Sequence, residues 1–147
     1  MILEIKVLGT EHLEDVLKIE EECFSKPWSE NSVKELLLSE KAELLGAFDG
    51  GRLIGYSCLE WVLDEGSLTN IAVSDEYRKM GVGSQLMAAL MKTAEEKELA
   101  FITLEVRVSN LPAVNLYRKF GFLDVGTRRN YYDAPREDAL LMTRYIK

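Results

Sequence analysis

The 147 residues include 25 acidic and 18 basic side chains, for a net charge of −7, and 47% of the residues are hydrophobic. This length and composition exclude an intrinsically disordered chain and predict a single domain over residues 1–147 with a substantial core. The acidic balance disfavours direct nucleic-acid binding, which depends on Lys and Arg neutralising phosphates, and it suits a cationic partner better.

The sequence lacks the segments and side-chain sets of several protein classes. Its uncharged apolar runs are far shorter than the roughly 20 residues of a membrane span, and residues 1–8 lack the cleavage site of a secretory signal. One histidine and two cysteines cannot form a Cys/His zinc site or a disulfide framework, and a Ser-His-Asp triad would have to use His12. We therefore expect a cytoplasmic protein without a metal site or a membrane contact.

Hydrophobic periodicity predicts an alternation of strands and helices. In chain order it predicts a strand at 2–8, helices after Thr10 and Ser29, strands at 44–48, 53–61 and 68–73, a long helix after 83, a strand at 101–106, a helix from Pro112 to Phe120, and strands at 122–132 and 138–146. The segment Asp49-Gly50-Gly51 is typical of a hairpin turn. Hairpins followed by strand-helix-strand crossovers indicate a mixed α/β fold.

A glycine-bearing loop, Arg78-Lys79-Met80-Gly81-Val82-Gly83-Ser84, lies between a predicted strand and a predicted helix. The unpaired N–H groups of a helix start attract anions, and glycines permit close approach, so the loop could cradle a pyrophosphate. It is not a P-loop, because Ser84 and Gln85 follow its last glycine instead of Lys and Ser or Thr. A dinucleotide-binding fingerprint includes an acidic residue downstream of its glycines, and Glu105 could be that residue. The fingerprint also needs a third glycine, however, where Leu86 stands. A glycine turn that binds nothing also stays open.

Several sequence blocks, in their order, resemble the GNAT acetyltransferases. They are LTNIAV at 68–73, RKMGVG at 78–83, which matches the signature R/Q-x-x-G-x-G/A, LEVRVSN at 104–110 and LYRKFGF at 116–122. More narrowly, the block at 104–110, KPWS at 26–29, RRNYY at 128–132 and REDA at 136–139 resemble the RimI-type ribosomal-protein-alanine N-acetyltransferases of bacteria.

The resemblance implies a GNAT fold, with a mixed, mostly antiparallel sheet of about seven strands, about four helices and a V-shaped splay between strands 4 and 5. It implies contacts with acetyl-CoA from Ile71, Ala72, Val73, Arg78, Lys79, Met80, Gly81, Val82, Gly83, Ser84 and Asn110. The implied reaction is direct acetyl transfer, in a ternary complex, to the N-terminal alanine of a small-subunit ribosomal protein. A monomer is the favoured assembly.

Glu105 and Tyr117 are the candidate catalytic residues. Alternation places Glu105 on the strand face opposite Ile102 and Leu104. From the residues alone, Glu105 pairs with a base such as Arg107 or Arg128, and Tyr117 is a core aromatic with a satisfied hydroxyl. The resemblance instead implies a general base acting through water and a general acid for the CoA thiolate. Proton transfer from a phenol to a thiolate is uphill by roughly 2 kcal/mol, so we expect hydrogen bonding to be the larger role of Tyr117.

The resemblance further implies an acceptor pocket lined by Trp28, Tyr131 and Tyr132. From the residues alone, Trp28 is as well explained as a loop anchor that packs on the second helix. The run at 20–22, three glutamates, is expected to be a solvated helix face. Two other functions stay open, namely acetyl transfer to a lysine or small amine and a noncatalytic acyl-CoA sensor.

Overall fold

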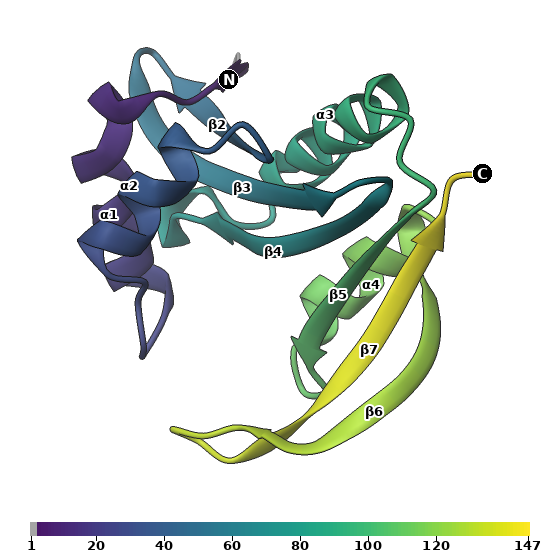
Figure 1. The fold of residues 1–147 in the computed structure, drawn as a ribbon. Helices are drawn as coiled ribbons and strands as arrows, with labels where there is room; N and C mark the ends of the chain where they lie inside the picture. The colour runs from purple at the N-terminus through teal and green to yellow at the C-terminus, as the bar shows by residue number, and fades with distance from the viewer. Residues whose placement is uncertain (1–2) are drawn as a thin grey trace.

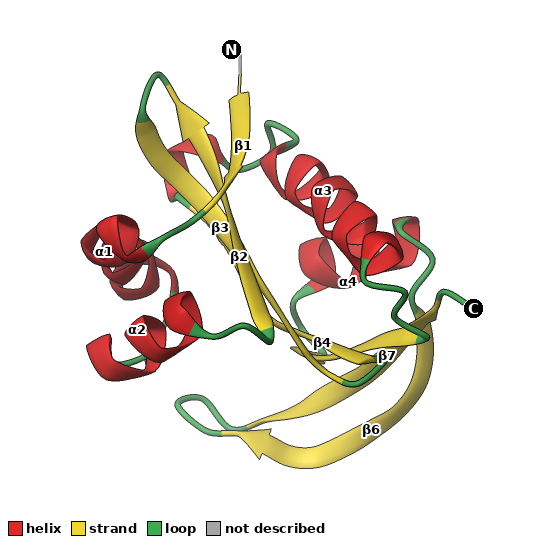
Figure 2. Cartoon of the chain, turned by 45° about the horizontal axis from the view of Figure 1, so that its top comes forward, coloured by secondary structure: helices red, strands yellow, loops and turns green. Residues whose placement is uncertain are grey.

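The computed structural model describes residues 3–147, which form one seven-stranded sheet with helices on both faces (Figures 1 and 2). The strands are β1 (Leu3–Val7), β2 (Ala42–Asp49), β3 (Arg52–Val62), β4 (Glu65–Val73), β5 (Phe101–Arg107), β6 (Leu123–Tyr132) and β7 (Glu137–Tyr145). The helices are α1 (Leu13–Cys23), α2 (Glu30–Leu38), α3 (Val82–Glu96) and α4 (Leu111–Lys119), with 3-10 turns at Thr10–His12 and Asp75–Tyr77. Residue 2 of the predicted strand 2–8 lies outside the described residues.

The strand order is β1-β2-β3-β4-β5-β7-β6, and every neighbouring pair is antiparallel except β4 and β5. This confirms the predicted mixed, mostly antiparallel sheet. Figure 2 shows α1 and α2 on one face and α3 and α4 on the other. Because both faces are covered, β3 is buried continuously from Leu53 to Leu59. Within residues 3–147, none of the helices has the length and apolar character needed to traverse a bilayer.

Local capping explains where the helices begin. The Ser29 hydroxyl accepts a hydrogen bond from the N–H of Ser32 (3.1 Å), so α2 begins at the residue after the predicted cap. The helix predicted after Thr10 begins later than expected. The Gly9 N–H donates to Nδ1 of His12 (3.0 Å), and a 3-10 turn therefore precedes α1.

The parallel pairing of β4 and β5 is short, and this creates the site. Only residues 65–67 pair with residues 101–103. The register of β3 against β4 then shifts, because Cys58 faces Asn70 while Leu59 faces Leu68, which leaves Thr69 as a bulge. A bulge bends its strand and increases its twist. From there β4 stays paired with β3 and β5 with β7, and the two halves of the sheet diverge (Figure 1), as the predicted splay requires.

Candidate active site

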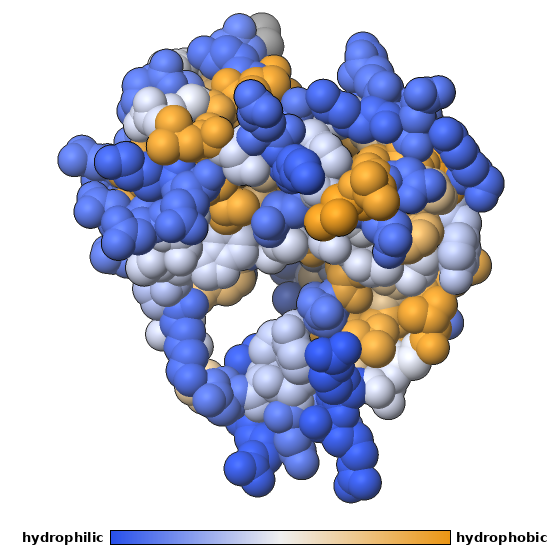
Figure 3. All heavy atoms as spheres, in the orientation of Figure 1, coloured by the Kyte–Doolittle hydropathy of each residue, from blue (hydrophilic) through white to orange (hydrophobic). Residues whose placement is uncertain are grey.

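A cleft of about 590 Å³ occupies the splay between β4 and β5. Figure 3 shows an opening at this level, bounded below by the β6–β7 hairpin. The cleft is lined by residues 23–26 before α2, 68–71 of β4, 105–107 of β5, Asn110 and Tyr117 of the α4 region, and 131–135 of the hairpin. The diverging strands therefore bring together side chains from five parts of the chain.

Glu105 is exposed although it lies within β5, because β4 has left its side by this point. Neither of the two arginines proposed as partners binds it. Arg107 pairs with Glu137 (3.3 Å), and the guanidinium of Arg128 lies over the Tyr131 ring at 5.1 Å. Within residues 3–147 the Glu105 carboxylate has no ion pair, and it lines the cleft. The ion-pair interpretation of Glu105 is therefore wrong.

Tyr117 is a buried aromatic residue that also lines the cleft. The side chain is 6% exposed, and its ring packs against Phe122 with centroids 5.9 Å apart. Burial, with a smaller contribution from Tyr132, raises the pKa of the Tyr117 phenol above its ordinary value. Among the described residues the hydroxyl has no hydrogen-bond partner, in contrast to the satisfied hydroxyl that the residues alone suggested. A neutral donor thus lies at the cleft wall.

Tyr132 lies close to both candidate catalytic residues. Burial raises its pKa to about 12, with a further contribution from the negative charge of Glu105. Tyr132 in turn contributes to the raised pKa of the Tyr117 phenol. Tyr131 and Tyr132 both line the cleft and pack edge to face, with ring centroids 5.0 Å apart. The structure therefore brings both predicted catalytic residues, Glu105 and Tyr117, and two of the predicted acceptor-pocket residues, Tyr131 and Tyr132, to one cleft.

The glycine loop forms the start of α3 and follows β4 and the 3-10 turn Asp75–Tyr77. Gly81 has φ = +81°, and a Cβ there would meet no atom within 4 Å. The first main-chain bond of the helix runs from Gln85 to Gly81, so the N–H groups of residues 82–84 remain free for an anion. At Gly83 a Cβ would lie 3.1 Å from Cδ2 of Leu116, so this glycine allows α3 to pack closely on α4. Open space therefore adjoins the loop at Gly81, whereas Gly83 is covered by Leu116.

The charged residues of the loop have distinct surroundings. Nε of Arg78 donates to the Val73 carbonyl (3.3 Å), and the guanidinium forms an ion pair with Asp75 (3.1 Å from Nε), whereas Lys79 and Met80 are exposed and the Val82 side chain is buried. Nζ of Lys119, on α4, lies 3.4 Å from the Ser84 hydroxyl. Lys119 is a cation at the helix start that the sequence analysis missed, because only the packing of α4 against α3 brings it there.

The predicted cofactor contacts along β4 are not equivalent. Ile71 lines the cleft, while the Ala72 side chain is buried in the cluster under α1 and α2. The Val73 carbonyl accepts from Sγ of Cys23 (3.4 Å) as well as from Arg78. Asn110 lines the cleft, and its side chain also accepts from the Ala113 N–H (3.4 Å) to cap α4.

Trp28 does not reach the cleft. Its side chain packs on the cluster of α1 and α2, beside Leu36, and lines a separate depression that includes Glu60. Its main-chain N–H donates to Oε1 of Glu20 (2.7 Å). These contacts support the loop-anchor interpretation of Trp28 and not a place in the acceptor pocket.

Glu20 corrects the expectation of a solvated helix face. It is 1% exposed, at the buried position four residues after Val16. Besides the bond from Trp28, its Oε2 accepts from the Tyr56 hydroxyl (2.5 Å) and from Nδ2 of Asn70 (2.6 Å). This carboxylate therefore joins α1, the α1–α2 loop, β3 and β4. Glu21 is exposed as expected, and sequence periodicity alone could have flagged Glu20 as facing the core.

The Glu20→Ala variant will be destabilised, because the buried Tyr56 hydroxyl loses its acceptor at a cost of about 1–3 kcal/mol, and the partly buried N–H groups of Trp28 and Asn70 lose theirs as well. The free energy of unfolding from urea denaturation measures this loss. Glu21→Ala, a change at the exposed neighbour, is the control and will stay within about 0.5 kcal/mol of the native chain. Equal urea midpoints for the two variants would show that the buried network contributes nothing.

The few potential metal ligands are dispersed. His12 accepts from Gly9 in the turn before α1, Cys58 is a buried residue of β3, and Cys23 is half-buried at the cleft wall. Within the part of the chain that is described, no group of three or more His, Cys, Asp and Glu is arranged to hold a metal ion.

Known proteins share both the sequence pattern and the fold. Residues 13–122 match the acetyltransferase (GNAT) family. The putative [ribosomal protein bS18]-alanine N-acetyltransferase of Bacillus subtilis (strain 168) is 39% identical over 94% of this chain and 92% of its own. The [ribosomal protein bS18]-alanine N-acetyltransferase of Escherichia coli (strain K12) is 36% identical over 94% of each chain.

The crystal structure of the ribosomal-protein-S18-alanine N-acetyltransferase from Escherichia coli superposes with a TM-score of 0.92 at 34% identity, covering 99% of this chain and 95% of that one. The predicted fold, with its splay between strands 4 and 5, and the predicted resemblance are thereby confirmed. The match of the family over most of the chain, together with relatives of this identity, shows that the chain belongs to the GNAT family of acetyltransferases.

Proposed function

We propose that this GNAT acetyltransferase transfers the acetyl group of acetyl-CoA to the N-terminal α-amino group of a protein, the N-terminal alanine of a small-subunit ribosomal protein. The observation that carries the proposal is that Glu105 and Tyr117 line one cleft, and that the β4 strand of its wall is followed, after one 3-10 turn, by the glycine loop. The names of the relatives supply the class of acceptor. We propose that the enzyme acts in the cytoplasm as a single-domain monomer, without a metal.

The glycine loop fits the pyrophosphate of acetyl-CoA, because free N–H groups at the start of α3 face open space beside Gly81. The main chain of residues 79–84 would hold the phosphates, and Arg78 and Lys119 would add positive charge. Ile71 and Asn110 would line the path of the pantetheine arm. When bound, acetyl-CoA supplies a thioester whose carbonyl carbon the acceptor nitrogen attacks, forming an amide as the C–S bond breaks.

Glu105 removes the proton that the amine must lose. Only a neutral amine attacks, and an α-amine with a pKa of about 8 is roughly a tenth neutral at pH 7, far more than a lysine with a pKa of about 10.4. An exposed carboxylate that has no ion-pair partner among residues 3–147 can accept a proton from the nitrogen, directly or through water. Exposure in the cleft also lets the proton pass to solvent.

Tyr117 acts on the departing sulfur. Burial raises its pKa, so the phenol keeps its proton and remains a hydrogen-bond donor. The same shift makes complete proton transfer to a thiolate still less favourable than for a free phenol, whose pKa is about 10. We therefore assign it a hydrogen bond that strengthens as negative charge develops on the sulfur.

The acceptor test is the release of free CoA from acetyl-CoA and a panel of peptides that begin with alanine, with the acetylated atom mapped by mass spectrometry. Acetylation of the α-amine supports the proposal. Release only with lysine side chains or polyamines would replace it with the second acceptor class. No release with any amine would leave a noncatalytic acyl-CoA sensor.

The pH dependence of the native enzyme follows from these roles. The value of kcat/KM for an Ala-starting peptide will rise with pH up to about 8, where the α-amine becomes neutral, and then level off. It will not fall by pH 10, because the raised pKa of Tyr117 keeps its phenol protonated above the ordinary range. A descending limb with an apparent pKa of about 9 would contradict this assignment.

A further inference from the structure

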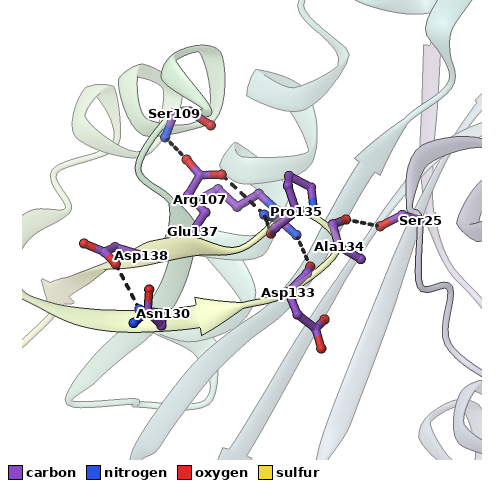
Figure 4. Close-up of polar contacts among 9 residues, drawn as sticks. All are labelled: Ser25, Arg107, Ser109, Asn130, Asp133, Ala134, Pro135, Glu137 and Asp138. Atoms are coloured by element: carbon purple, nitrogen blue, oxygen red, sulfur yellow. Dashed lines mark hydrogen bonds and ion pairs between the residues drawn. The ribbon is translucent and has the colours of Figure 1, made fainter.

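Arg107 ends β5 two residues after Glu105, so the two side chains lie on the same face of the strand. Its guanidinium reaches the loop between β6 and β7 (Figure 4). Nη1 donates to the Pro135 carbonyl (2.8 Å) and Nη2 to the Asp133 carbonyl (3.1 Å). One side chain of β5 thus holds two main-chain groups of the loop that lines the cleft.

The guanidinium is itself held by Glu137. Nη1 lies 3.3 Å from Oε1 of Glu137, and Oε2 accepts from the Ser109 N–H (2.7 Å), as Figure 4 shows. The Ser109 hydrogen bond, assisted by the Arg107 charge, holds the pKa of the Glu137 carboxyl below its usual range. The side chains of Arg107 and Glu137 are 27% and 16% exposed, so this ion pair is better shielded from solvent than the pair between Lys26 and Asp133 of the same loop.

Arg107 also contacts the aromatic side chain beside the catalytic pair. Its guanidinium carbon lies 4.4 Å from the centroid of the Tyr132 ring. Tyr132 lines the cleft, and the negative charge of Glu105 contributes to its raised pKa. A planar guanidinium can stack on a ring and present its donors in a fixed fork at the same time, which an ammonium group cannot do.

The opposite side of the loop has weaker attachments. The Ser25 hydroxyl donates to the Ala134 carbonyl (3.1 Å), and Lys26 pairs with Asp133. The side chains of that ion pair are 64% and 74% exposed, and exposed pairs contribute little. Among the side-chain contacts of the loop, those of Arg107 are therefore the better shielded from solvent.

We propose that Arg107 is a positioning residue, which fixes Tyr132 and residues 133–135 beside Glu105 and so forms the acceptor side of the cleft. This inference rests on the proposed function. Arg107 makes none of its contacts with the glycine loop, so acetyl-CoA binding should not depend on it.

The test is Arg107→Lys, which keeps the charge and removes the fork. The KM for an Ala-starting peptide will rise about tenfold, equivalent to about 1.4 kcal/mol. The kcat will change much less, and the Kd for acetyl-CoA, measured by calorimetry, will be unchanged. Arg52→Lys is the matched control, because Arg52 pairs with Glu76 (2.7 Å) and faces the Tyr77 ring but does not line the cleft. An unchanged peptide KM, or a weakened acetyl-CoA affinity, in Arg107→Lys would overturn the inference.

Amide hydrogen exchange separates this inference from the proposed function. In Arg107→Lys, exchange will accelerate in residues 130–137 and stay unchanged elsewhere, whichever amine the enzyme accepts. If the native enzyme acetylates only lysine or a small amine, the proposed acceptor fails, and the KM for that amine then tests Arg107. Faster exchange throughout the chain would overturn a positioning role, and so would unchanged exchange at 130–137.

Discussion

The Glu105→Gln variant will lose about 10²- to 10⁴-fold in turnover, the usual contribution of a general base. Glutamine has nearly the same shape and cannot accept the proton of the attacking amine. The carboxylate is exposed in the cleft and has no ion-pair partner among residues 3–147, so its replacement disturbs no packing. Steady-state kinetics with acetyl-CoA and an Ala-starting peptide measures the loss.

Two measurements make the Glu105 result specific. The thermal midpoint of Glu105→Gln will match that of the native enzyme, and Glu4→Gln, at an exposed position of β1, will keep full activity. Because the α-amine is mostly protonated below pH 8, the defect will be present from pH 6 to 8. Full activity of Glu105→Gln across pH 6 to 9 would eliminate this residue as the base.

Tyr117→Phe will lower kcat by about 10²-fold, as the loss of one donor to developing charge does in other enzymes, while the Kd for acetyl-CoA stays unchanged. The ring contact with Phe122 is retained, and within the described chain the hydroxyl has no partner to leave unpaired. The variant will therefore be nearly as stable as the native enzyme. Losses of similar size in kcat and in acetyl-CoA affinity would contradict this role.

Tyr56→Phe is the matched control for Tyr117→Phe. Its hydroxyl donates to the buried carboxylate of Glu20 at 2.5 Å, so the same substitution removes a structural hydrogen bond. This variant will lose stability by about 1 kcal/mol and keep its turnover, whereas Tyr117→Phe will show the reverse pattern. Chemical denaturation and steady-state kinetics on both variants separate a catalytic hydroxyl from a structural one.

Much of the fold could be predicted because its signals are local. The alternation at 101–106, the cap at Ser29 and the turn at Gly50-Gly51 each depend on a few neighbouring residues, and each lies where the structure has it. The glycine loop was recognisable for the same reason. Trp28 was harder to assign, because the packing of a loop tryptophan is decided by residues far away in the chain. Periodicity could have placed Glu20 toward the core, but its hydrogen-bond partners are also distant in sequence.

The sequence by itself determined the order of strands and helices, the glycine-bearing helix start at Gly81, and the family resemblance that makes Glu105 and Tyr117 candidates, since periodicity, capping and sequence motifs are carried by contiguous residues. Only the tertiary structure decided that Glu105 faces an open cleft, that Glu20 is buried among donors from three elements, and that Arg107 holds the β6–β7 loop. The exposure of Glu105 depends on where the pairing of β4 with β5 stops after residue 67. That point is set by a bulge and by packing between segments far apart in the chain, and no short stretch of residues encodes it.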